Sequence, residues 1–184
     1  MKKKEIPVAE SRFAALDDLM PLFREQLAAG QSVRFSPRGA SMLPMLRQGI
    51  DSVVLSPLPD KLKKYDLPLY QRHDGHYVLH RIVAAGETYT CIGDNQFVLE
   101  LGLKHEQMIA VVTAFYRGDR EIKVSNPGHR LYCRLWHYSR PLRRFWRQGI
   151  NFLRRGYRGL FQGRSHQRQS GDPGGRKPSG GDQL

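Results

Sequence analysis

The sequence contains few cysteines and no long apolar run. Cys91 and Cys133 are the only cysteines, which excludes a disulfide framework and indicates a reducing compartment. No window approaches the roughly 18 apolar residues that a membrane span requires. The basic start at Met1–Lys4 is not followed by the apolar segment of a secretion signal. We therefore expect a cytoplasmic protein.

Acidic residues are scarce near the end of the chain. The formal net charge is +13, but basic and acidic residues nearly balance up to Gly128, and beyond it only Asp172 and Asp182 are acidic. From 129 to 163, arginines alternate with large apolar and aromatic side chains, as in a helix at the interface of an anionic membrane. This pattern predicts a peripheral position on the inner face of the membrane. Residues 164–184, rich in Gly, Ser, Pro and Gln, are predicted to be disordered.

Two other interpretations of the basic segment stay open. Arginine combined with aromatic side chains also binds RNA or another polyanion, although we favour nucleic acid less than a membrane. The segment could equally be a basic helix that packs on its own domain.

The remainder divides into a helical segment, residues 1–30, and a β-rich domain, residues 31–128. Apolar residues at near-helical spacing predict helix between Ser11 and Ala29, with Pro21 in the first turn of a second, shorter helix that begins near Asp18. Gly30 is the expected C-terminal cap. The β-branched and aromatic runs predict strands at Ser32–Ser36, Ser52–Ser56, Leu67–Gln71, Tyr77–Val83, Thr88–Ile92, Met108–Tyr116 and Glu121–Val124.

The dipeptide Asp74-Gly75 predicts a hairpin between Leu67–Gln71 and Tyr77–Val83. Because side chains alternate along a strand, His80 then shares a face with Val78, and Arg81 points to the opposite face.

Ser41 lies in the run R-G-A-S-M-L-P-M-L and is the candidate nucleophile of a peptidase. Small Gly39 and Ala40 precede it, so a substrate can approach its backbone closely. A serine hydroxyl needs a positioned base, and His80 has the ordinary pKa that suits this task. Asp94, in the turn Gly93-Asp94-Asn95, is the candidate acid that orients the imidazole.

Four segments in order, Gly39–Pro44, Tyr65–Tyr70, His80–Ile82 and Gly93–Asn95, resemble the type I signal peptidase family and the wider superfamily it shares with LexA-like serine peptidases. The similarity covers about half the chain. The H-R-I segment, in place of a lysine, is similar to the branch of the endoplasmic-reticulum and archaeal enzymes. The resemblance implies a mainly β fold, with a coiled sheet or partly open barrel between an N-terminal helical segment and the basic C-terminal helix.

The resemblance also implies a mechanism: Ser41 as nucleophile, His80 as base and Asp94 as orienting acid. Two positions depart from the family. Gly39 stands where many members have a hydroxyl residue that binds the oxyanion, so the oxyanion would rest on backbone N–H groups around Ala40 and Ser41. Glu100 stands where members often have a second aspartate.

The predicted function is a serine endopeptidase that cleaves an extended peptide with small residues next to the scissile bond. We expect the substrate to add as a strand beside Val33 and Phe35. No cofactor or metal is expected, because His73, His76 and His80 have no neighbouring ligand cluster. The alternative is a non-catalytic protein that uses the same fold to hold a peptide, lipid or nucleic acid.

Overall fold

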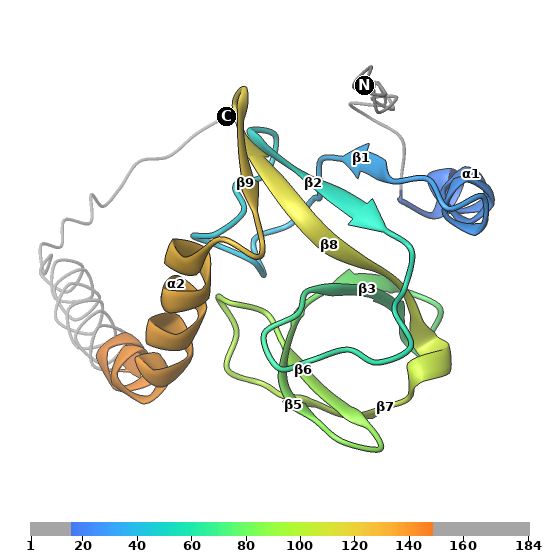
Figure 1. The fold of residues 1–184 in the computed structure, drawn as a ribbon. Helices are drawn as coiled ribbons and strands as arrows, with labels where there is room; N and C mark the ends of the chain where they lie inside the picture. Colours follow the sequence, from blue (N-terminus) through green and yellow to red (C-terminus); the bar gives the residue numbers. More distant parts are fainter. Residues whose placement is uncertain (1–15, 149–184) are drawn as a thin grey trace, which may run out of the picture. The chain divides into compact units, whose positions relative to one another are not determined.

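The computed structural model describes residues 16–148, which are mainly β. Two antiparallel sheets lie between helix α1 and helix α2 in the chain (Figure 1). The elements are α1 Leu16–Ala28, β1 Val33–Phe35, β2 Asp51–Ser56, β3 Pro68–Gln71, β4 Tyr77–Leu79, β5 Arg81–Ala85, β6 Tyr89–Ile92, β7 Glu100–Leu103, β8 Met108–Arg117, β9 Arg120–Lys123 and α2 Pro127–Tyr138, with a short 3₁₀ turn at His105–Gln107.

The larger sheet is organised around β8. Its strands follow the order β1-β2-β8-β3-β4, and β9 also pairs with β8. Along β8, buried residues alternate with more exposed ones, as expected for a strand with one face on a core. That core joins β2, β3 and β8 to the buried side of α1, where Met20, Phe23 and Leu27 lie. Figure 1 shows β2 and β8 running side by side.

The predicted hairpin is confirmed. β3 and β4 pair antiparallel with Leu69 opposite Leu79, and Gly75 adopts a φ of 87° in the connecting turn. A positive φ is strained for most residues but not for glycine, which explains the Asp-Gly pair at this position.

The predicted strand Tyr77–Val83 is wrong in one respect that matters for the site. β4 ends at Leu79 and belongs to the larger sheet, whereas β5 begins at Arg81 in the three-stranded sheet β5-β6-β7. His80 is therefore the residue at which the chain passes between sheets. The smaller sheet has its own buried cluster, to which β3 contributes Tyr70.

β7 was not predicted from the sequence. Its residues Glu100–Leu103 include a glutamate and a glycine, both rare in strands. Gly102 has a φ of 69°, and the β6–β7 register shifts between Tyr89 and Cys91. An irregular strand of this kind leaves little periodicity to recognise.

The expected break at Pro21 is wrong, because α1 continues through Pro21 to Ala28. Gly30 follows with a φ of 73°, as predicted for a helix cap. The predicted helical residues 11–15 lie outside the described part of the chain.

α2 begins at Pro127, where the Asn126 side chain accepts a hydrogen bond from the N–H of Gly128. Among the described residues, those from 16 to 140 form one compact unit, and a second unit begins at Pro141. The expected boundary at Gly128 assigns most of this helix to the C-terminal segment, but its His129 and Cys133 are buried.

Among residues 16–148, no helix has the length and apolar character to cross a bilayer. The predictions for residues 149–163 and 164–184 lie outside the described residues.

Candidate active site

Ser41 lies in a compact turn segment between β1 and β2. Backbone hydrogen bonds join Leu43 N–H to Ala40 and Leu46 N–H to Met42. The side chains of Met42, Met45 and Leu46 are buried in the core of the larger sheet. Apolar burial thus anchors the segment, while Ser41 itself remains partly exposed.

Ser41 and His80 line the same pocket, as the peptidase prediction requires. The pocket has a volume of about 230 Å³. It lies between the segment that follows β1 and the strand β4, which are far apart in sequence. Its lining residues are Pro37, Arg38, Gly39, Ser41, Met42, Leu46, Arg72, Tyr77, Val78, Leu79, His80 and Gln96.

His80 is oriented by Glu100. Its Nδ1 lies 2.8 Å from Oε1 of Glu100, and the His80 side chain is only 2% exposed. An ionised carboxylate can only accept, so Nδ1 must carry the proton in this contact. Nε2 is then the ring nitrogen with a free electron pair, which is the form a general base needs.

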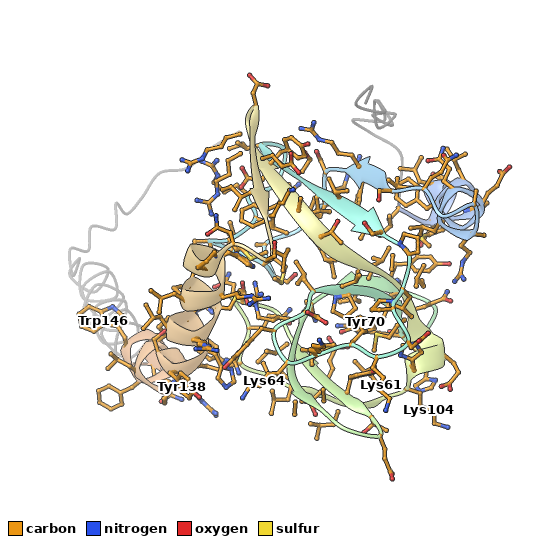
Figure 2. All side chains as sticks on the ribbon, viewed as in Figure 1. Lys61, Lys64, Tyr70, Lys104, Tyr138 and Trp146 are labelled. Atoms are coloured by element: carbon orange, nitrogen blue, oxygen red, sulfur yellow. The ribbon has the colours of Figure 1, made fainter. Side chains whose placement is uncertain are left out.

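Arg72 and Tyr70 hold Glu100 in its ionised form. Arg72 donates through Nε, 2.8 Å from Oε2, and through Nη2 to Oε1. The Tyr70 hydroxyl, which also lies 3.2 Å from Nδ1 of His80, hydrogen-bonds the same carboxylate. Burial alone would raise the pKa of Glu100, but these hydrogen bonds and the charge of His80 lower it below its ordinary value. Tyr70 is labelled in Figure 2, on β3.

The pKa of His80 is lowered as well. Burial is the largest cause, because it disfavours the charged imidazolium, and the carboxylate of Glu100 opposes the shift. His80 is therefore neutral at pH 7 and ready to accept a proton.

Asp94, the expected orienting acid, occupies a different place. Its two carboxylate oxygens accept from Nε and Nη2 of Arg81 at 2.9 and 2.8 Å. Both side chains are almost fully buried. The carboxylate at Nδ1 of His80 belongs to Glu100, which corrects the assignment of Asp94 and gives Glu100 a definite position. The chain passes from one sheet to the other at His80, so His80 and Arg81 reach different carboxylates.

The turn Gly93-Asp94-Asn95 nevertheless contacts the Ser41 segment directly. The Asn95 N–H donates to the Ser41 carbonyl at 2.8 Å, and the Asn95 side chain donates to the Ala40 carbonyl at 3.1 Å. A Cβ on Gly93 would lie 2.7 Å from the Ser41 oxygen, so only glycine fits. The turn holds the candidate nucleophile rather than the candidate base.

Gly39 has a conformational reason to be glycine. Its φ is 95°, in the region that disfavours other residues, although a Cβ at this position would meet no atom within 4 Å. A serine or threonine here would be strained. A hydroxyl residue at position 39 is therefore disfavoured by this backbone, and the Gly39 N–H donates to Oε1 of Gln48 at 3.0 Å.

Val33 and Phe35 do not present side chains to a substrate. Both are buried, and the Phe35 ring packs 5.5 Å from that of Phe23. β1 is an end strand of its sheet, as is β4 on the opposite end. Any substrate contact along β1 would therefore use its backbone.

A larger pocket, of about 780 Å³, is lined by a cysteine and a histidine, but their protonation states do not suit catalysis. Cys133 Sγ and His129 Nε2, both lining it, lie 3.3 Å apart. Burial raises the pKa of Cys133, and burial together with the charge of Arg81 lowers the pKa of His129 to about 4. Both groups are neutral at pH 7, so no thiolate is available as a nucleophile. The pocket of Ser41 is therefore the better candidate for an active site.

Three residues that contribute to the site were not predicted: Tyr70, Arg72, and Glu100 as the partner of His80. The sequence signalled Glu100 only as the first acid after the turn at Gly93–Asn95. Comparison with known proteins adds no assignment, since no family model, curated protein or solved structure matches the chain.

Proposed function

We propose that this protein is a serine endopeptidase with Ser41 as nucleophile and His80 as general base. The observation that carries the proposal is that an accessible serine and a buried, carboxylate-bound histidine line one small pocket. The orienting acid in this proposal is Glu100. The fold type proposed with it is that of the signal-peptidase and LexA-like superfamily, which the order of the four sequence segments supports.

In the proposed reaction, the Ser41 hydroxyl attacks a peptide carbonyl and Nε2 of His80 takes its proton. Glu100 stabilises the imidazolium through Nδ1–H, as an acid in a triad does. Nε2 then returns the proton to the leaving amine. Water, deprotonated by the same nitrogen, releases the acyl group from Ser41. Backbone N–H groups near Ala40 and Ser41 would bind the oxyanion.

The size of the pocket limits which substrate side chains can bind. A volume of about 230 Å³ suits small side chains next to the scissile bond. The end strands β1 and β4 both lead to this pocket, so an extended peptide can add to the backbone of either one. We therefore propose a peptide or protein substrate that binds extended, with small residues before the cut.

Peripheral attachment to an anionic membrane, from the cytoplasmic side, remains part of the proposal. Residues 140–148 are helical, and Leu142, Phe145 and Trp146 are all at least 68% exposed. Of these, Trp146 is labelled in Figure 2. Their spacing places them on one helix face, as in interfacial helices.

Substitution of either reacting residue tests the enzyme proposal. Ser41→Ala and His80→Ala should each lower cleavage of a peptide with Ala-x-Ala before the scissile bond by about a thousandfold or more, because the two groups act as a unit. Exposed Ser36→Ala and His73→Ala are matched controls that should cleave normally. Circular dichroism checks that each variant is folded.

A serine-directed covalent probe, read by intact mass, gives an independent result. Labelling of the wild type but not of Ser41→Ala supports the nucleophile. Absence of both labelling and cleavage would instead support a non-catalytic peptide-binding protein on this fold. Unchanged turnover in Ser41→Ala or His80→Ala removes the proposed mechanism.

A further inference from the structure

Helix α2 contacts the turn that holds Ser41. The indole N–H of Trp136 donates to the backbone carbonyl of Asp94 at 2.8 Å. This contact joins residues 42 positions apart in sequence, within the compact unit that ends at Arg140. It therefore connects a C-terminal helix to the segment beside the candidate active site.

The Trp136 ring is fixed by a series of stacked rings. It stacks on Tyr132, with centroids 5.8 Å apart and planes 14° apart. Tyr132 stacks in turn on His129, which packs against Phe115 of β8 at 5.2 Å. The direction in which the indole N–H points is thus set by packing on the larger sheet.

The peptide group between Asp94 and Asn95 connects Trp136 to Ser41. The carbonyl of Asp94 and the N–H of Asn95 are the two ends of the same planar unit, and in a trans peptide they point in opposite directions. Trp136 donates to the first end, and the second end donates to the Ser41 carbonyl at 2.8 Å. Two hydrogen bonds therefore fix the orientation of this peptide plane, and each bond polarises the other.

A second path runs in parallel through Arg81. Its guanidinium donates to Cys133 Sγ on α2 at 3.0 Å and to Met45 Sδ in the Ser41 segment at 2.7 Å. The same group binds both oxygens of Asp94. Both paths begin on α2 and end on the segment that carries the nucleophile.

We infer that Trp136 is a positioning residue for Ser41: its indole N–H orients the Asp94–Asn95 peptide, which holds the Ser41 carbonyl and so places the hydroxyl. This inference rests on the proposed function for its effect on catalysis. The hydrogen bonds that connect Trp136 to the Ser41 segment do not depend on it. Small displacements of a nucleophile reduce reaction rates steeply. α2 is thereby part of the catalytic unit rather than an appendage.

The two tryptophans of the chain supply a matched pair of variants. Trp136→Phe removes the donor and keeps an aromatic ring, whereas Trp146→Phe changes a residue that is 70% exposed. With the Ala-x-Ala peptide we expect Trp136→Phe to lower kcat about tenfold or more while KM stays within about twofold. Trp146→Phe should leave both values unchanged. A purely structural role would alter neither kcat nor KM in a folded variant.

Hydrogen exchange measures the link without any turnover. The amide of Asn95 and the peptide covering residues 39–46 should exchange faster in Trp136→Phe than in the wild type or Trp146→Phe. If the wild type cleaves no peptide but this contrast is seen, the proposed function fails and the link stands. If exchange is the same in all three proteins, the inference is overturned.

Trp136→Phe could also disturb packing in the stack. In that event, benzothienylalanine at position 136 keeps the shape of the indole and replaces its N–H by sulfur. The same changes in kcat and exchange from this smaller alteration support the inference. Wild-type values for both would overturn it.

Discussion

His80 and Arg81 are adjacent in sequence, and each contacts a carboxylate, but their surroundings differ. His80 lines the pocket of Ser41, and its partner Glu100 accepts further hydrogen bonds from Arg72 and Tyr70. Arg81–Asp94 is buried, with exposures of 2% and 1%. All five N–H donors of Arg81 can be accounted for by contacts to Asp94, Tyr65 O, Cys133 Sγ and Met45 Sδ.

The two pairs differ in their protonation: His80–Glu100 joins a neutral ring to a carboxylate, whereas Arg81–Asp94 is an ion pair. Burial lowers the pKa of His80, so the ring is neutral at pH 7 and can take the proton of Ser41 in the proposed reaction. Burial would lower the pKa of Arg81, but Asp94 raises it above its ordinary value, so this pair stays charged. In the proposed mechanism His80 must change its protonation state, whereas Arg81 stays charged and its donors hold the groups around it in place.

The largest expected effect is on stability, at Arg81. Arg81→Met leaves the Asp94 carboxylate buried without its partner, which should reduce the free energy of unfolding by about 3–5 kcal/mol. Urea denaturation followed by circular dichroism measures the change. The matched variant Arg72→Met, which breaks a pair that is 36% and 19% exposed, should lose only about 1 kcal/mol. Equal losses in the two variants would contradict a structural role specific to Arg81.

A smaller effect, on rate rather than stability, is expected at Glu100. Glu100→Gln keeps the size of the side chain but removes its charge, so the imidazolium formed at His80 loses its counter-ion. We expect kcat to fall about a hundredfold, and the free energy of unfolding to fall by only about 1 kcal/mol, because the lost pair with Arg72 is partly exposed. Glu106→Gln, in the 3₁₀ turn, is the control that should retain activity. Full activity in Glu100→Gln would remove this residue from the mechanism.

The smallest effect is a shift in pH dependence. Because the pKa of His80 is lowered from 6.5, its neutral form persists to a lower pH than in free histidine, and kcat/KM should decline only below pH 6.5. Glu100 raises the pKa of His80, so residual activity of Glu100→Gln should decline at a still lower pH. Profiles of kcat/KM against pH measure both midpoints. A midpoint above 6.5 in the wild type would contradict the lowered pKa.

Local sequence signals predicted most of the elements that build the site. The runs that became β2, β3, β6 and β8 were recognisable from β-branched and aromatic residues. The Asp74-Gly75 turn placed β4 beside β3 correctly. Ser41 and His80 were also candidates from sequence, and both line the pocket.

The partner of His80 was not predictable in the same way. Asp94 lies closer to it in sequence and in a recognisable turn, whereas Glu100 lies in an irregular strand that follows. Which carboxylate reaches Nδ1 depends on the break between β4 and β5 and on the register of β7 against β6. The same holds for Trp136, whose sequence context showed only an aromatic basic segment.

By itself the sequence determined the types of the local elements, the glycines that its turns need and the serine and histidine available for chemistry, since these depend on neighbours along the chain. The tertiary structure decided which groups meet: Glu100 with His80, Asp94 with Arg81, and Trp136 with the turn beside Ser41. Such contacts depend on how two sheets and a helix pack, and packing is a property of distant residues together.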